Sequence, residues 1–452
     1  MKSGIIWHTQ GCGKTALAYY SVKSLTDYFA QRNVVAKFYF IVDRIDLMEQ
    51  ATDEFAARGL VVHNAKSRKE LMDDIASREV TSNDEGKPEI MVVNIQKFKE
   101  DKAKVTVDDS YSTNLQRIFF VDEAHRGYNP QGSFLANLLE ADQSAVKIAL
   151  TGTPLLKEER ESWRVFGDYI HTYYYDKSIA DGYTCKLMRE PVETVYKEQI
   201  ENILDQLAGN VEVKKSDIDR NQIMEHESYL NALLDYIISD FRRFRKEQND
   251  ETVGAMIVCR TNPQARELYR LWQERFNIAS KVSQHQEQQM YMAAEPMLQY
   301  GNYKPLTASL ILHDEGDKQE RKEYIEGFKK LQEIDVLIVN KMLLTGFDAP
   351  RLKKLYLGCS LDGHDLLQAL TRVNRPYHDF KYGYVVDFVD IKENFDATND
   401  RYLRELNRTS DESDNTHTEN IANDILVSKE DVETKIKEIK SVLFNFTIDD
   451  VE

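Results

Sequence analysis

A glycine-containing loop between a short apolar run and a helical pattern constrains the fold of this chain more than any other feature. The run Gly4–Trp7 is apolar, and apolar residues within Lys14–Ala30 recur near helical spacing. Residues 9–15, at the junction, read TQGCGKT. A strand, a glycine-containing turn and a helix in this order form a phosphate-binding loop, because glycines let backbone amides turn inward and the helix N-terminus adds partial positive charge. The sequence therefore predicts a nucleotide-binding site.

We expect the whole loop to bind ATP. Lys14 would reach the β- and γ-phosphates, and the hydroxyl of Thr15 would ligate Mg²⁺. The strict pattern has glycine five residues before Gly13, where this chain has His8. Cys12 fits as a small filler, and the alternative to a nucleotide site is a chance glycine-rich turn. The expected ATP-binding residues of the loop are Thr9, Gln10, Gly11, Cys12, Gly13, Lys14 and Thr15.

Strand and helix patterns alternate in two stretches of the chain. Helical patterns occur at Ile45–Arg58, Pro263–Phe276 and His364–Val373, in addition to the one that follows the loop. The further apolar runs that predict buried strands are Lys37–Val42, Ile90–Val93, Arg117–Val121, Val146–Leu150, Met256–Cys259, Ser309–Leu312, Val336–Val339, Leu355–Leu357 and Tyr384–Phe388. Strands that alternate with helices form parallel βαβ units. The predicted fold class is therefore α/β, with two parallel-sheet lobes.

The same patterns predict domain limits. Residues 1–170 would form the first lobe, and residues 171–395 the second, with a charged helical insertion at about 195–250. Residues 408–420 have almost no apolar content and predict a linker. Since Asp424–Phe446 has helical spacing, residues 396–452 would be a linker and the start of a helical domain.

An acidic pair follows the apolar run that ends at Val121. Asp122 and Glu123 begin the tetrapeptide DEAH, and a carboxylate at a strand end beside a phosphate loop suits Mg²⁺. We expect Asp122 to hold the metal ion and Glu123 to act as general base toward the attacking water. His125 has no second ligand at a metal-binding spacing, so we predict no metal role for it. The alternative for the acidic pair is an exposed turn.

Two further segments carry candidate residues. Thr151 and Thr153 belong to TGTP, which ends the next apolar run. This segment resembles one that couples the nucleotide site to a nucleic-acid track in helicase-like proteins, and the alternative is a plain turn. The helical pattern near residue 370 contains QALTRVNR, in which Gln368, Arg372 and Arg375 are spaced to share one face. Planar guanidinium groups suit a γ-phosphate, so we predict catalytic roles for these three residues. The alternative is a solvated helix face.

In order, HTQGCGKT, DEAH, TGTP, LTGFDAP and QALTRVNR resemble the motifs of superfamily 2 helicase-like motors. The longer strings IIWHTQGCGKT, FIVDRIDLMEQ, VNIQKF, DEAHRGY and LLTGFDAP resemble the R (restriction) subunits of type I restriction enzymes, over roughly residues 3–390. The resemblance implies two RecA-like lobes of P-loop NTPase type that use ATP and Mg²⁺ to pull double-stranded DNA past methylase and specificity subunits. It implies a cytoplasmic, prokaryotic enzyme. Because the family's nuclease domain precedes this motor, we expect the chain to be a fragment without it.

By the same resemblance, residues of both lobes would contact DNA. The candidates are Arg44, Gln96, Thr261, Thr345 and Gly346. Asp348, in the same LTGFDAP segment, would face the nucleotide. Arg44 could instead pair with a carboxylate on its own helix, and LTGFDAP could be a plain turn before Pro350.

Charge and cysteine content limit the other classes of function. The net charge of −17 argues against a general basic surface, although a local track of amides, hydroxyls and a few cations suffices for a motor. The four cysteines lie far apart, without zinc or disulfide spacing. A spacing of acidic residues and lysine similar to that of nuclease sites occurs at Asp387, Asp390 and Lys392, but we favour a structural role for them. The remaining alternatives are a strand-separating helicase on DNA or RNA, and a catalytically inactive nucleic-acid-binding fragment.

Overall fold

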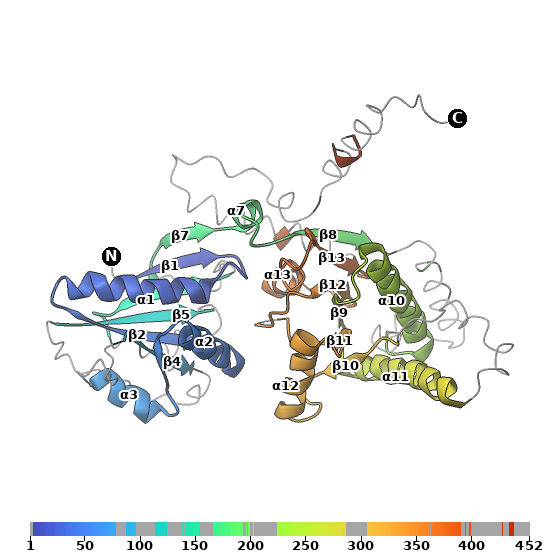
Figure 1. Cartoon of the computed structure of the whole chain (residues 1–452), viewed down its shortest axis with the longest axis horizontal. Coiled ribbons are helices and arrows are strands. Elements are labelled where there is room, and N and C mark those ends of the chain that lie inside the picture. The colour runs from blue at the N-terminus through green and yellow to red at the C-terminus, as the bar shows by residue number, and fades with distance from the viewer. Residues whose placement is uncertain are drawn as a thin grey trace, which may run out of the picture. The chain divides into compact units, whose positions relative to one another are not determined.

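The computed structural model contains two compact units, which centre on Met1–Thr184 and Cys185–Thr398 (Figure 1). Apart from isolated positions, the residues that the structure describes are 3–77, 87–95, 114–123, 142–152, 166–192, 224–285, 305–344, 346–361 and 363–389. The division between the units falls after Thr184, whereas the predicted first lobe ends at residue 170. Among the described residues, no helix is both long and apolar enough to cross a membrane.

The first unit is built on a seven-stranded sheet, within the described residues, in the order β3-β4-β2-β5-β6-β1-β7. All neighbouring strands pair in parallel. The strands are β1 (Ser3–His8), β2 (Val35–Val42), β3 (Val61–Asn64), β4 (Glu89–Asn94), β5 (Leu115–Asp122), β6 (Val146–Thr151) and β7 (Tyr169–Tyr173). The helices are α1 (Lys14–Ala30), α2 (Ile45–Ala57), α3 (Arg68–Ala76) and α7 (Tyr175–Ala180). The strands β3 and β7 form the two edges.

Helices cover both faces of this sheet, which explains why its central strands read as continuous apolar runs. On one face, Val22 of α1 and Phe55 of α2 pack with Phe40 of β2 in one cluster of buried side chains. On the other face, Leu71 of α3 packs with Tyr39 in a second cluster. Because β2 is buried on both sides, its alternating residues enter different clusters, and the strand needs no polar face.

The second unit contains a six-stranded sheet, again within the described residues, in the order β10-β11-β9-β12-β13-β8. Its strands also pair in parallel. They are β8 (Lys186–Pro191), β9 (Gly254–Val258), β10 (Ala308–Ile311), β11 (Val336–Val339), β12 (Leu352–Leu357) and β13 (Tyr382–Asp387). The helices are α10 (Glu227–Gln248), α11 (Asn262–His285), α12 (Lys318–Glu326), the π-helical turn η4 (Gly327–Leu331) and α13 (Gly363–Leu370).

The helix α10 lies in the region where the sequence predicts a charged helical insertion. Its apolar residues follow helical spacing and include Leu230, Leu234, Ile237 and Phe241, all of which are buried in the core cluster of the second unit. The helix therefore packs on the sheet like the other helices of this unit, and two of its charged residues, Asp240 and Arg245, are buried with it.

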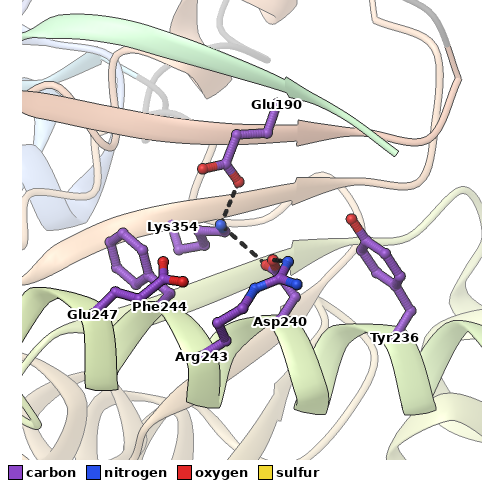
Figure 2. Close-up of a pocket in the computed structure, with 7 residues that line it drawn as sticks. All are labelled: Glu190, Tyr236, Asp240, Arg243, Phe244, Glu247 and Lys354. Carbon is purple, nitrogen blue, oxygen red and sulfur yellow. Dashed lines mark hydrogen bonds and ion pairs between the residues drawn. The ribbon is translucent and has the colours of Figure 1, made fainter. Parts of the chain in front are cut away.

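A buried ion-pair cluster joins α10 to the sheet, beside a small cavity of about 210 Å³ (Figure 2). Asp240 of α10 accepts a hydrogen bond from Tyr356 of β12 at 2.7 Å, and its Oδ2 lies 3.0 Å from Nζ of Lys354. Lys354 also pairs with Glu190 of β8, and Arg243 donates to Asp240 at 3.1 Å. A buried lysine therefore has two carboxylate partners, from two different elements.

The prediction of two parallel α/β lobes is confirmed. The helix α1 begins and ends where the periodicity places it, and β11 also matches its predicted range. One helix was wrongly extended, because α13 ends at Leu370 and not at Val373. The carbonyl of Gln368 accepts hydrogen bonds from the side chains of Thr371 and Arg372, so the chain turns away at this point. Of the predicted C-terminal helix, the structure describes Val427, which is not helical, and residues 434–437, which are helical.

Candidate active site

The candidate residues of the first unit meet at one edge of its sheet. The loop 9–15 follows β1, Glu123 follows β5, and Gly152 follows β6. Because β6 lies between β5 and β1 and all three strands are parallel, their carboxyl ends open at the same edge. Ligands of open α/β sheets bind outside the carboxyl ends of the strands. Segments more than 100 residues apart in sequence therefore form one site (Figure 1).

The loop has the backbone conformation that its glycines allow. Gly11 and Gly13 have φ values of 94° and 79°, in the left-handed region that side chains rarely adopt. Gly13 is the N-cap residue of α1, and no side chain caps the helix there. The loop is held from inside, since the Cys12 thiol contacts the Thr9 hydroxyl and donates to the Thr9 carbonyl at 2.7 Å. The amides at the start of α1 are thus presented as an anion site.

Lys14 and Glu123 face one another across this edge. The Nζ of Lys14 lies 3.8 Å from Oε1 of Glu123, and both side chains are about nine-tenths buried, at 10% and 8% exposure. Glu123 has a φ of 48°, which is uncommon for a residue other than glycine and is often seen where a side chain is aimed at an active site. The pair is the geometric centre of the candidate site.

Asp122 lies beside this pair at the end of β5. Burial and the neighbouring carboxylate of Glu123 raise the pKa of Asp122 to about 7, and Lys14 opposes the shift. The backbone N–H of Glu123 donates to Oδ1 of Asp122 at 3.1 Å. A carboxylate of Asp122 and the hydroxyl of Thr15, a half-buried residue in the first turn of α1, are oxygen ligands of the kind that Mg²⁺ takes. The residues therefore fit a magnesium ion.

Gly152 of the TGTP segment closes the site from the side of β6. A Cβ at this position would lie 3.0 Å from Nζ of Lys14 and 3.2 Å from Cγ of Gln10. Glycine is therefore the residue that lets the backbone at position 152 lie this close to Lys14 without moving the lysine side chain. Thr151 is fully buried at the end of β6, and its register partner is Trp7 of β1. Thr153 lies outside the described residues.

The candidate residues of the second unit also gather in one place. Arg375 donates to Oδ1 of Asp348 at 2.9 Å, and Arg372 donates to the carbonyls of Phe347 and Gln368. Arg372 is 3% exposed, and Gln368 is also buried. The three predicted residues do not share one helix face, because both arginines follow the end of α13. Of the two guanidinium groups, that of Arg375 is the more exposed.

The predicted DNA-binding residues differ in their position and in their contacts. Arg44 is half-buried and precedes α2, at the carboxyl end of β2, which is next to β5. Thr261 caps α11, because its hydroxyl accepts from the Gln264 amide at 3.2 Å and donates to Glu225 at 2.6 Å. Gly346 has a φ of 68° in the segment after β11. Gln96 and Thr345 lie outside the described residues, so these roles stay predictions.

Sequence reasoning missed a histidine pair at the entrance of the loop. The Nε2 of His8 and the Nδ1 of His171 are 2.8 Å apart, and His171 comes from the edge strand β7. No pattern in the sequence predicts this contact, since it requires β7 to lie beside β1.

Asp387, which the sequence analysis considered as a nuclease-like residue, forms an ion pair with Arg189 at 2.7 Å. The other two residues of that group, Asp390 and Lys392, lie outside the described residues.

Comparison with protein families divides the chain into two consecutive regions. Residues 1–221 match the SWI2/SNF2 ATPase family, and residues 221–390 match domain 3 of the type I restriction enzyme subunit R. The first region contains the whole loop and acidic pair, and the second contains Asp348, Arg372 and Arg375. Both groups of candidate residues thus lie inside matched regions.

The chain is also similar to curated endonuclease subunits of type I restriction enzymes. The chain is 26% identical over 438 residues to the endonuclease subunit assigned to the type I restriction enzyme MjaVIIIP of Methanocaldococcus jannaschii, covering 88% of the chain and 42% of that relative. It is 27% identical over 441 residues to the SauCOLORF180P endonuclease subunit of Staphylococcus aureus (strain COL), covering 90% and 44%. The chain spans about two fifths of the length of these relatives.

A solved structure has the same fold. It is a fragment assigned as the HsdR subunit of a type I restriction enzyme from Vibrio vulnificus YJ016, with a TM-score of 0.51 and 17% identity. The similarity covers 87% of this chain and 61% of the solved one. At this identity the comparison establishes the fold alone.

Proposed function

Because the chain joins a SWI2/SNF2 ATPase region to domain 3 of a type I restriction enzyme R subunit, we propose that it is an ATP-driven translocase of double-stranded DNA. In this proposal it is the motor part of a prokaryotic, cytoplasmic restriction enzyme. The observation that carries the proposal is the meeting of Lys14, Glu123 and Gly152 at one sheet edge. A phosphate loop alone would fit many nucleotide-binding proteins, but a buried acidic pair facing its lysine fits hydrolysis.

The chemistry is in-line attack of water on the γ-phosphorus of ATP, which breaks the bond to the β–γ bridging oxygen and releases ADP. Lys14 and the amides at the start of α1 bind the phosphate oxygens. Glu123, whose carboxylate lies beside Lys14, orients the attacking water and accepts its proton. Asp122 and Thr15 would hold Mg²⁺, which supplies positive charge to the phosphate oxygens when bound. Positive charge from Arg375, and from Arg372 if its backbone contacts are released, would stabilise the transition state.

DNA would be held by a local track and not by a basic surface, since the chain carries a net charge of −17. Arg44 follows a strand beside the one that ends in the acidic pair, which favours coupling between a DNA contact and the nucleotide. Thr151 and Thr153 would transmit the state of the nucleotide, and Gln96, Thr261, Thr345 and Gly346 would add contacts. The methylase and specificity subunits of a type I complex would supply sequence recognition.

The experiment is steady-state ATP hydrolysis with and without linear double-stranded DNA, with Lys14→Ala as control. We expect duplex DNA to stimulate a rate that the control lacks. Translocation is then measured by displacement of a triplex-forming strand placed downstream on the duplex, which a motor removes without separating the duplex. Omission of Mg²⁺ should abolish both activities.

Two outcomes would favour other functions. Stimulation by single strands only, with separation of a labelled duplex, would support a strand-separating helicase on DNA or RNA. If the wild-type rate equals that of Lys14→Ala under all conditions, the chain is not a working ATPase, and an inactive nucleic-acid-binding fragment is the better description.

A further inference from the structure

The edge strand β7 is fastened to the entrance of the phosphate loop at two points. The backbone amide of Thr9, the first residue of the loop, donates to the carbonyl of Tyr173 at 3.0 Å. One residue earlier, the ring of His8 is bonded to the ring of His171 through Nε2 and Nδ1, 2.8 Å apart. Both contacts run between the end of β1 and the end of β7, whose residues pair in parallel up to His8 and Tyr173.

The His8 ring has a defined environment. His8 is 9% exposed and stands where strict phosphate loops have glycine, and its ring centroid lies 4.9 Å from that of His171 and 5.5 Å from that of Tyr173. Burial, together with His171 and the positive charge of Lys14, lowers the pKa of His8 to about 4. His8 is therefore neutral at pH 7, and one ring nitrogen of the pair donates while the other accepts.

A neutral imidazole has one donor and one acceptor nitrogen, and the bond made by one nitrogen sets the role of the other. The bond to His171 thus sets the orientation of the His8 ring, and the role of each facing nitrogen depends on the role of the other. Since the His8 backbone leads directly into Thr9, rotation of this ring would disturb the first residues of the loop. A phosphate loop with glycine at this position has no side chain there that could bond to β7. The bond is therefore specific to a loop that has histidine at this position.

The same strand leads to the second unit. The helix α7 follows β7 directly, and the second unit begins at Cys185, shortly after α7 ends. The hydroxyl of Tyr173 donates to Asp181 at 2.6 Å, which ties the end of β7 to the residue after α7. A continuous set of bonds therefore connects the phosphate loop with the segment that joins the two units.

We propose that His171 is a positioning residue for nucleotide binding, which acts through His8 to hold the entrance of the phosphate loop against the connecting segment β7–α7. The inference rests on the proposed function, because the loop must bind ATP for its position to matter. His171 is exposed and needs no contact with the nucleotide. Its effect is on affinity, since it shapes the loop before the chemical step.

Two substitutions separate the hydrogen bond from the ring. In His171→Asn, the side-chain amide places a polar atom near the position of Nδ1 and keeps the bond to His8. In His171→Phe, the ring remains, and phenylalanine suits a strand, but the bond is lost. One hydrogen bond contributes about 0.5–1.5 kcal/mol, so we expect His171→Phe to raise KM for ATP by roughly 2- to 13-fold. The value of kcat should stay within about twofold, and His171→Asn should restore KM.

A matched control comes from the opposite edge of the same sheet. His63 of β3 pairs with Glu89 at 3.1 Å and is 40% exposed in its side chain, so it is also an edge-strand histidine that pairs with another side chain. His63→Phe and His63→Asn should leave KM and kcat unchanged. The affinity of each variant for the fluorescent nucleotide mant-ADP is measured in parallel, because it reports on the loop without hydrolysis.

The results distinguish the two proposals. If His171→Phe leaves both KM and the Kd for mant-ADP unchanged, or if His171→Asn fails to restore them, the positioning role is overturned. If the wild type binds mant-ADP but hydrolyses no ATP, the proposed function fails, and the Kd values of the variants still decide the role of His171. If the wild type binds no mant-ADP, both proposals are overturned.

Discussion

The ammonium group of Lys14 lies 3.8 Å from the carboxylate of Glu123, and both side chains are about nine-tenths buried, at 10% and 8% exposure. Lys14 begins the helix after β1, whereas Glu123 follows β5, and β6 separates these strands in the sheet. A γ-phosphate that binds Lys14 would replace one of its contacts with Glu123. The carboxylate would then be available to water at the point where the phosphate reacts.

Glu123→Gln should separate binding from hydrolysis. The amide keeps the size of the side chain but removes the general base, so we expect ATP to bind while the hydrolysis rate falls by roughly 10²- to 10⁴-fold. Lys14→Ala should instead lose binding itself, because it removes the charge that meets the phosphates. Both are measured as phosphate release and as mant-ATP binding. A Glu123→Gln variant that hydrolyses ATP at the wild-type rate would exclude Glu123 as the base.

Gly152→Ala should weaken nucleotide binding through a single methyl group. The new Cβ would lie 3.0 Å from Nζ of Lys14 and 3.2 Å from Cγ of Gln10, which is closer than most such contacts. The flexible lysine can move, so stability should change by less than about 1 kcal/mol, while the Kd for mant-ATP should rise several-fold. Gly59→Ala, a position with open space but a φ of 92°, is the opposite control, with lower stability and unchanged binding. Equal Kd values for Gly152→Ala and wild type would contradict this view of the site.

The sequence was most informative where residues are buried on both sides or lie in a strict pattern. The strand β2 is predicted because Lys37–Val42 is almost wholly apolar, and burial on both faces of a parallel sheet requires that. The loop 9–15 and the acidic pair are predicted as one site because parallel strands end at one edge. Strong local patterns and a simple topology suffice for these parts.

The edge strands could not be found in this way. The strand β7, YIHTY, has no fully buried residue, and β3 is only four residues long, so neither has the apolar run of a central strand. The contact between His8 and His171 depends on β7 and joins residues 163 positions apart. The end of α13 was also not predicted, because it depends on the side chains of Thr371 and Arg372, which donate hydrogen bonds to the Gln368 carbonyl.

Substitution of Arg372 should mainly lower stability, whereas substitution of Arg375 should mainly lower the rate of ATP hydrolysis. Arg372 is buried and donates to two backbone carbonyls, one of them in the segment that contains Asp348, so Arg372→Ala should lower the free energy of unfolding by about 3 kcal/mol. Arg375→Ala removes an ion pair with a half-exposed aspartate and should cost less than about 1 kcal/mol. If Arg375 stabilises the transition state, its loss should reduce ATP hydrolysis by roughly 10³-fold.

Urea unfolding and ATP hydrolysis of both arginine variants provide the test. Arg375→Lys is a useful companion, because it keeps the charge but loses the planar donor pair and should recover little activity. Equal losses of stability in Arg372→Ala and Arg375→Ala would show that burial does not distinguish their roles.

The ion-pair cluster beneath α10 should be sensitive to the removal of its cation. Lys354→Met would leave Asp240 buried without its main cation, so we expect a loss of about 3–5 kcal/mol in the free energy of unfolding. The double variant Lys354→Met/Asp240→Asn should recover part of this loss. Lys330→Met, which breaks an exposed pair with Glu326, should cost less than about 1 kcal/mol. Urea midpoints measure all three, and a small effect of Lys354→Met would mean that water enters the cavity and solvates Asp240 (Figure 2).

The stability of the first unit should fall in mild acid because of His8. Its pKa is lowered from 6.5 to about 4 in the folded chain, so between these values the unfolded chain binds a proton that the folded chain does not. Stability due to this residue is therefore complete above about pH 6.5 and is lost as the pH falls toward 4, by on the order of 3 kcal/mol. His8→Asn cannot titrate, and its unfolding temperature should fall less steeply over this range than that of the wild type. Parallel curves for the wild type and His8→Asn between pH 7 and 4.5 would show that His8 gains its proton as easily in the folded chain as in the unfolded one.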